Sequence, residues 1–193
     1  MVFLVFCRHL LLWLSLTSAY SLHALDCTSE IPAQNRYDLV FEVVGDLLGI
    51  DPCKHKAQLL VENSTLDRYA TSPVGAIGCA QIMPATWNEW TRDKHDLRTF
   101  KQKNCIDSII VSGLIMAGHL EFWSNYKDGS LSEDEVWNFS VAAYNRGRQG
   151  VLNDLERSGV LRPVWRLVRK VVNHETSQYV DKIKFLHGLL LRR

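Results

Sequence analysis

The chain has almost no net charge of either sign. Its 193 residues carry 22 Lys and Arg against 21 Asp and Glu, a formal net charge of +1. Removal of residues 1–24 takes away Arg8 and no acid, which leaves 21 basic residues against 21 acidic ones. Such a chain has no strong field to recruit nucleic acid or an anionic membrane surface. It stays compatible with an uncharged substrate, of which sugar is one.

The sequence also lacks the closely spaced ligands that a zinc site needs. No two of Cys27, Cys53, Cys79 and Cys105 are close together in the chain, and no pair of His residues stands at ligand spacing. We therefore expect no metal. An even number of cysteines in an exported chain favours two structural disulfides. Three connectivities are possible, and the sequence does not distinguish them.

No segment alternates apolar and polar residues at period two, which argues against a sizeable sheet. No internal repeat, low-complexity tract or linker divides the chain. Apolar residues instead recur at spacings of three and four, and Asp51-Pro52 and the capping box Ser132 to Glu135 mark two helix starts. The predicted helices cover 37–48, 52–62, 84–90, 106–120, 133–143, a segment from Pro163, and 179–190. The sequence predicts an all-α single domain with an irregular loop over 63–83.

Residues 1–24 are predicted to be a signal peptide that precedes a domain over 25–193. An apolar run from Leu10 to Leu16 has the length of a signal-peptide core, and small residues near Ala19 and Ala24 suit cleavage. Arg8 interrupts the apolar character, which argues against a membrane-spanning helix of about 20 residues. We expect export across the inner membrane to the periplasm. The alternative is retention by an uncleaved N-terminal segment.

Glu62 is the first candidate for chemistry. It ends an apolar helical stretch over 57–61 and leads into a loop rich in Gly, Ser and Pro. The negative end of the helix dipole and an apolar wall both disfavour a carboxylate, so both raise the pKa of Glu62. A general acid at neutral pH needs such a raised pKa. The helix taken alone favours the simpler interpretation, a solvated charge at a helix end.

Two further segments carry side chains that suit a neutral sugar. The loop over 72–87 combines glycines with Gln81, which can both donate and accept hydrogen bonds. The segment from Ala142 to Gly147 places Tyr144 and Asn145 at the end of a helix of small residues. Amides and aromatic faces recognise uncharged sugars. Taken singly, Tyr144 suits a core position and Asn145 a helix C-cap.

Together these segments resemble the catalytic domain of the soluble lytic transglycosylase family. The motifs are Glu62, then Ser-Pro-x-Gly-Ala-x-Gly-x-x-Gln-Ile-Met-Pro-Ala-Thr over 72–86, then Ala-Tyr-Asn-x-Gly over 143–147. The likeness continues at 50–52, 113–120 and 178–183, in the family's order, and spans roughly 36–187. It implies a lysozyme-like fold of the goose-type class.

The resemblance implies that this is an enzyme acting on the glycan strands of peptidoglycan without a metal or organic cofactor. It implies that Glu62 acts as acid and then as base on the bond between N-acetylmuramic acid (MurNAc) and N-acetylglucosamine (GlcNAc), with a 1,6-anhydro product. The residues that it implies for the sugar site are Gln81, Met83, Tyr144, Asn145 and Tyr179.

The sequence departs from the family pattern beside its glutamate. The family has Ser directly after Glu, whereas this chain has Asn63 and then Ser64, and its interval from Glu to Gln is one residue longer. We expect either Asn63 or Ser64 to orient Glu62 by a hydrogen bond. Cys79 and Ala80 stand where the family has a larger apolar pair before its Gln. We expect this change to reshape the floor of the sugar-binding groove or to fix it by a disulfide. The nearby Asp67 is expected to be a loop or surface residue rather than a second catalytic carboxyl.

Two other functions remain open at this stage. One is a goose-type lysozyme-like hydrolase, and the other is a peptidoglycan-binding or assembly protein that has kept the fold without turnover. A small exported enzyme of this kind would act as a monomer, in wall turnover, in phage entry, or beside a secretion, conjugation or other cell-envelope apparatus. Nucleic acid is not an expected partner.

Overall fold

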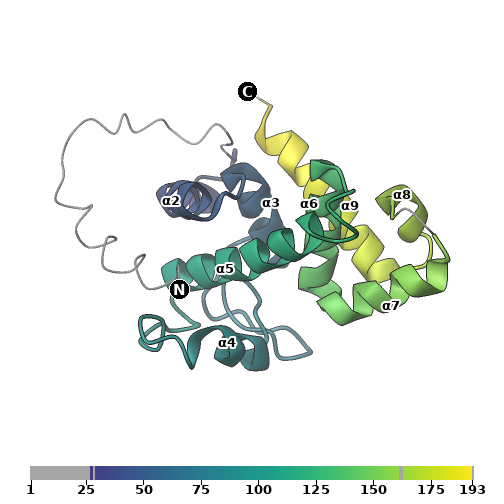
Figure 1. Cartoon of the computed structure of the whole chain (residues 1–193). Coiled ribbons are helices and arrows are strands. Elements are labelled where there is room, and N and C mark those ends of the chain that lie inside the picture. The colour runs from purple at the N-terminus through teal and green to yellow at the C-terminus, as the bar shows by residue number, and fades with distance from the viewer. Residues whose placement is uncertain (1–26, 28, 161–162, 193) are drawn as a thin grey trace.

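The computed structural model describes residues 27, 29–160 and 163–192, and the predicted signal peptide over 1–24 lies outside them (Figure 1). The described chain is built of helices joined by irregular segments. They are the 3-10 helix η1 (Pro32–Asn35) and the α-helices α2 (Asp38–Leu48), α3 (Pro52–Glu62), α4 (Pro84–Thr91), α5 (Cys105–Ser124), α6 (Glu133–Arg146), α7 (Arg148–Ser158), α8 (Trp165–Val168) and α9 (His174–Leu190). In these ranges the only β-pairing consists of isolated bridges within the loop after α3. The all-α prediction is confirmed.

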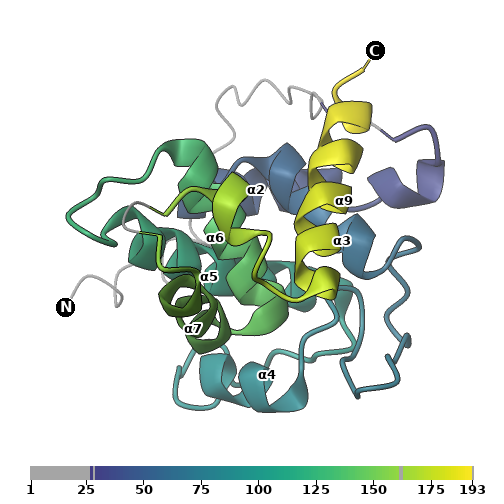
Figure 2. The same ribbon diagram turned by 90° about the vertical axis from the view of Figure 1, so that its right-hand side faces the viewer.

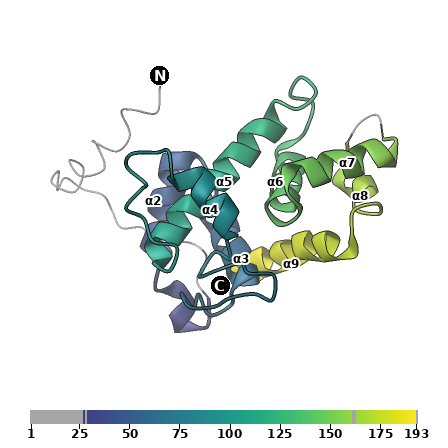
Figure 3. The ribbon, with the colours of Figure 1, turned by 90° about the horizontal axis from the view of Figure 1, so that it is seen from below.

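Helix α5 runs through the centre of the molecule (Figure 1). Helices α2 and α4 lie on opposite sides of it in Figure 1, and α6, α7 and α8 lie together on the right of it in the view from below (Figure 3). The last helix, α9, lies alongside α3 and also contacts α6 (Figure 2). The C-terminal helix therefore packs on the helix that ends in Glu62.

By length and composition, α5 could cross a membrane, and no other helix in the described ranges could. Its contacts show a different role, because half of its most apolar stretch is buried inside the protein. A Cβ atom at Gly113 would lie 2.5 Å from Val44, so the missing side chain lets α2 approach α5 closely. Helix α5 is the central helix of the core.

The end of α2 and the start of α3 follow local sequence signals. Gly49 ends α2 in the left-handed conformation, with φ of 66°. The Asp51 carboxylate accepts hydrogen bonds from the backbone N–H groups of Cys53 and Lys54 and so begins α3. These signals need only neighbouring residues, and for that reason the sequence reveals them.

The predicted capping box at the start of α6 is only half formed. The Ser132 hydroxyl accepts a hydrogen bond from the Glu135 backbone N–H. The Glu135 carboxylate, which a capping box would turn back onto Ser132, instead accepts one from the Trp165 N–H at 2.6 Å. Glu135 thus joins α6 to α8.

The sequence interpretation did not include α7, and the helix expected from Pro163 begins at Trp165 and has four residues. Helix α7 follows α6 after Gly147 alone and contains Gly150, which weakens its helical pattern. Tertiary contacts stabilise it. The fully buried carboxylate of Asp154 pairs with Arg146 at 3.0 Å and also with Arg157.

The four cysteines form two disulfides, as predicted, and the open connectivity is Cys27–Cys53 and Cys79–Cys105. The first ties the N-terminal segment to α3. The second ties the loop after α3 to the first residue of α5. The helix that precedes the loop over 63–83, and the loop itself, are therefore each held covalently to a segment distant in sequence.

Candidate active site

Glu62 is the last residue of α3, and α9 reaches it from the side. The Tyr179 hydroxyl donates a hydrogen bond to Glu62 Oε1 at 2.5 Å. The residue is half-buried, and the loss of water around its carboxyl raises its pKa from 4.5 to about 7. The Tyr179 hydrogen bond lowers that pKa, and the negative charge of Glu175 raises it. The site thus holds a carboxyl that can keep a proton near neutral pH.

Tyr144 faces the same carboxyl from the end of α6. Its hydroxyl donates a hydrogen bond to the Ala80 carbonyl at 2.9 Å, which joins α6 to the loop over 63–83. Burial raises the pKa of Tyr144 and of Tyr179 well above 10, and the charge of Glu62 raises both further. Both phenols are therefore neutral hydrogen-bond donors beside Glu62. The structure brings together three residues from α3, α6 and α9.

The Asn63 side chain holds the loop rather than Glu62. Its amide group donates to the Asp67 and Gly78 carbonyls at 2.8 and 3.2 Å. Its oxygen accepts from the Thr65 hydroxyl and the Asp67 N–H at 3.1 and 3.2 Å. All four hydrogen-bonding positions of this amide are thus occupied by the loop.

The prediction that Asn63 orients Glu62 is therefore wrong, and the hydrogen bond to Glu62 Oε1 comes from Tyr179 instead. Ser64 is exposed, and its carbonyl accepts a hydrogen bond from Gln34. Asp67 is also exposed, and its carboxylate accepts from the Tyr69 N–H at 2.9 Å. The Asp67 carboxylate is thus held by its own loop, and an orienting role for Ser64 stays a prediction.

Gln81 lies in the loop with a left-handed backbone, with φ of 46°. Such a conformation is unfavourable for residues other than glycine and requires support from the surrounding structure. Support comes from its own amide group, which donates to the Gly78 carbonyl at 2.8 Å and more weakly to the Ala70 carbonyl at 3.4 Å. The donors of Gln81 therefore brace the loop, and its side-chain oxygen is the atom left for a ligand.

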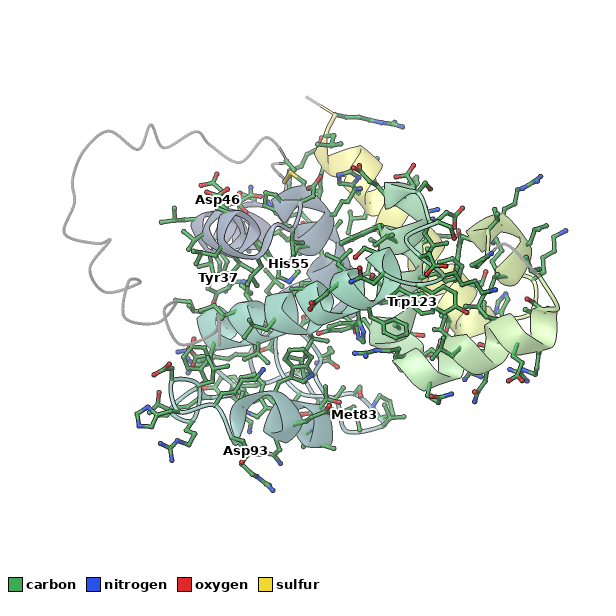
Figure 4. The ribbon with its side chains drawn as sticks, viewed as in Figure 1. Tyr37, Asp46, His55, Met83, Asp93 and Trp123 are labelled. Carbon is green, nitrogen blue, oxygen red and sulfur yellow. A yellow bond between two sulfur atoms is a disulfide. The ribbon has the colours of Figure 1, made fainter. Side chains whose placement is uncertain are left out.

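Met83 stands where the loop enters α4, and 41% of its surface is exposed. In Figure 4 it lies at the end of α4 nearer to α7. An exposed thioether of this kind offers an adaptable apolar contact.

Asn145 is held by a residue that the sequence interpretation missed. The hydroxyl of Thr176, fully buried on α9, donates to the Asn145 side-chain oxygen at 2.7 Å. This leaves the Asn145 amide N–H groups as donors. Glu175, also missed, precedes Tyr179 by four residues, so both lie on one face of α9. That spacing was the signal that could have identified Glu175.

Comparisons with known proteins identify a family and a similar fold. Residues 56–162, more than half of the chain, match the model of the family "Transglycosylase SLT domain". The fold is similar to the X-ray structure of an inactive mutant of the lytic transglycosylase Slt from Pseudomonas aeruginosa, with a TM-score of 0.62, 21% identity and 80% of this chain covered. The chain spans 24% of that protein. No curated protein matched the sequence.

Proposed function

The chain belongs to the transglycosylase SLT domain family, and from this premise we propose that it is a lytic transglycosylase that cleaves peptidoglycan glycan strands with Glu62 as its single catalytic carboxyl. The observation that carries the proposal is the carboxyl of Glu62, with a pKa of about 7 and one oxygen bound by Tyr179. At neutral pH about half of such groups are protonated. One group can then give a proton and later take one.

In the first step the Glu62 carboxyl gives its proton to the glycosidic oxygen between MurNAc and GlcNAc. The bond from MurNAc C1 to that oxygen breaks, and GlcNAc leaves as an alcohol. The carbonyl oxygen of the MurNAc 2-acetamido group bonds to C1 and stabilises its positive charge. The substrate thus takes the place of the second carboxylate that many glycosidases use.

In the second step the Glu62 carboxylate accepts the proton of the MurNAc C6 hydroxyl. The C6 oxygen bonds to C1, and the bond from C1 to the acetamido oxygen breaks. This closes the 1,6-anhydro ring and returns Glu62 to its protonated form. The pKa of about 7 suits both steps, because acid and base forms are close in free energy.

The neighbouring side chains are proposed to bind and position the sugar. Tyr179 engages Oε1 of Glu62 and leaves the other oxygen for the substrate. The Gln81 oxygen and the Asn145 amide N–H groups offer an acceptor and donors for hydroxyl and acetamido groups. Met83 offers an apolar contact, and Tyr144 holds the loop near the carboxyl.

Product analysis tests the reaction. Mass spectrometry of digested peptidoglycan is expected to show anhydro-MurNAc products that are lighter than hydrolysis products by one water. Reducing-end MurNAc as the main product would identify a lysozyme-like hydrolase instead. Binding of glycan strands without any product would identify a peptidoglycan-binding protein.

The proposed setting is the periplasm, where the chain would act as a monomer after export. Two disulfides are consistent with an oxidising compartment. The proposed roles are wall turnover, phage entry, or service to a secretion, conjugation or other envelope apparatus, and the identity of the genes beside its own would distinguish them.

A further inference from the structure

A hollow of about 350 Å³ lies where the loop after α3 meets the starts of α2 and α5. Its main lining side chains are Tyr37, Arg68, Tyr69, Lys101, Lys103 and Ile106. Figure 4 shows Tyr37 beside α2, on the far side of the molecule from α7. Glu62 is not among the lining residues, so this hollow is separate from the candidate active site.

Three of the lining side chains are cations and none is an acid. This composition stands out in a chain whose formal net charge is only +1. Two carboxylates on the same segments belong to Asp67, whose charge acts on Arg68, and to Asp107. They are engaged by backbone N–H groups, that of Tyr69 at 2.9 Å and that of Lys101 at 2.8 Å. The side chains that line the hollow itself therefore carry positive charge only.

One of these cationic side chains is held in place by an aromatic neighbour. The Arg68 guanidinium lies 4.6 Å from the centre of the Tyr69 ring and donates a hydrogen bond to its hydroxyl. Tyr69 and Ile106 are 60% and 46% exposed, so apolar surface stands beside the cations. A guanidinium held over a ring is less free to move and binds a carboxylate with less loss of entropy. The hollow thus suits a ligand with carboxylates and short apolar groups.

The same loop connects the hollow to the candidate active site. The Ala70 carbonyl, next to Tyr69, accepts hydrogen bonds from the Gly78 N–H at 2.8 Å and from the Gln81 amide. Cys105 lines the hollow and is bonded to Cys79, two residues before Gln81. Arg68 and Gln81 therefore lie on one braced segment.

We infer that this hollow binds the free carboxylates of the peptide that a MurNAc residue carries, while the glycan strand occupies the site beside Glu62. The inference rests on the proposed function, because only a peptidoglycan substrate brings such a peptide. A stem of about five residues spans at most roughly 17 Å when extended. Arg68 follows Glu62 by six residues. The extended peptide is therefore about as long as the chain segment that separates Glu62 from the hollow.

The first experiment compares two substrates. The variant Arg68→Gln/Lys101→Gln/Lys103→Gln and the control Arg166→Gln/Lys170→Gln/Lys184→Gln remove the same charge from different exposed positions. Each is assayed on glycan strands with peptides and on strands whose peptides an amidase has removed. The first variant is expected to raise KM about fivefold or more on peptide-bearing strands only, and added salt should reduce the difference. The control should match the unmodified protein on both substrates.

A second experiment needs no turnover. The free muramoyl peptide and inorganic phosphate are each titrated into the unmodified full-length protein and the variant, and the Tyr and Arg side-chain signals are followed by NMR. Saturable shifts with the peptide, absent in the variant, would support the inference. Stronger shifts with phosphate would identify a phosphate site and overturn it.

Other results separate the two proposals. Equal effects of the variant on both substrates, or no effect on either, would overturn the peptide site and leave the lytic reaction intact. If the unmodified protein cleaves neither substrate, the proposed function fails. Peptide titration would then still decide whether the hollow binds carboxylates.

Discussion

The Tyr179 hydroxyl donates a 2.5 Å hydrogen bond to Oε1 of Glu62, a residue 117 positions earlier in the chain. This contact joins α9 to the end of α3. Three influences act on the pKa of Glu62: burial raises it, the Tyr179 hydrogen bond lowers it, and the charge of Glu175 raises it. The properties of the proposed acid thus depend on two residues of the last helix.

Replacement of Glu62 by Gln is expected to lower turnover of peptidoglycan by at least about 100-fold, because the amide keeps the shape and cannot supply a proton. Circular dichroism should show an unchanged helical fold. The matched control is Asp67→Asn, which changes an exposed carboxylate on the adjacent loop and should leave turnover within about twofold. Retained activity in Glu62→Gln would remove Glu62 from the mechanism.

The same substitution predicts a change in how stability depends on pH. The pKa of Glu62 is 4.5 in the unfolded reference and about 7 in the folded protein, so the folded state binds its proton more tightly. The resulting stabilisation is complete below pH 4.5 and is lost as pH rises through about 7, an effect of at most ~3 kcal/mol. Denaturant unfolding from pH 4 to 9 should show this loss in the unmodified protein and not in Glu62→Gln. Parallel profiles of the two proteins would contradict the raised pKa.

Two variants on α9 are expected to move the pH dependence of turnover in opposite directions. Tyr179→Phe removes a hydrogen bond that lowers the pKa of Glu62, so the fall in kcat/KM at alkaline pH should move to higher pH. Glu175→Gln removes a charge that raises it, so the fall should move to lower pH. Rates are measured from pH 5 to 9. If both variants moved the alkaline fall in kcat/KM in the same direction, the two residues would affect turnover through the fold and not through the pKa of Glu62.

The hydrogen bond from Thr176 to Asn145 predicts a positioning role. Thr176→Val keeps the shape of a fully buried side chain and removes the hydroxyl that holds the Asn145 amide at 2.7 Å. We expect a several-fold higher KM and a loss of stability of about 1 kcal/mol. Thr176→Ser, which keeps the hydroxyl, is the control and should restore KM. If Val and Ser raise KM equally, the methyl group matters and the hydrogen bond does not.

The two disulfides are expected to differ in their effect on turnover. Each joins cysteines 26 residues apart, so loss of either should reduce stability by a similar amount, about 3.5 kcal/mol in the chain-entropy account. Only Cys79–Cys105 holds the loop that carries Gln81. Cys79→Ala/Cys105→Ala should therefore lose more turnover than Cys27→Ala/Cys53→Ala, measured at a temperature where both remain folded. Equal losses would show that loop restraint is not needed.

Much of the fold could be predicted because helix signals are local. Gly49 and Asp51-Pro52 mark their helix ends through groups no more than a few residues away. Helix α7 could not be predicted in this way, since Gly150 weakens its local pattern and its support comes from packing on α6, where the buried Asp154 carboxylate pairs with Arg146. The disulfide connectivity could not be predicted from the sequence either, because four cysteines allow three pairings.

The sequence by itself determined the helical class and nominated most of the candidate site residues, since period, caps and motifs are properties of neighbouring residues. Only the tertiary structure decided how those residues contact one another. It brought the Tyr179 hydroxyl to Glu62, directed the Asn63 amide to carbonyls of the loop, and placed the Thr176 hydroxyl beside Asn145. The physical reason is distance along the chain. A pKa raised by burial depends on the segments that exclude water from the carboxyl, and here these include α6 and α9, whose Tyr144 and Tyr179 follow Glu62 by 82 and 117 residues.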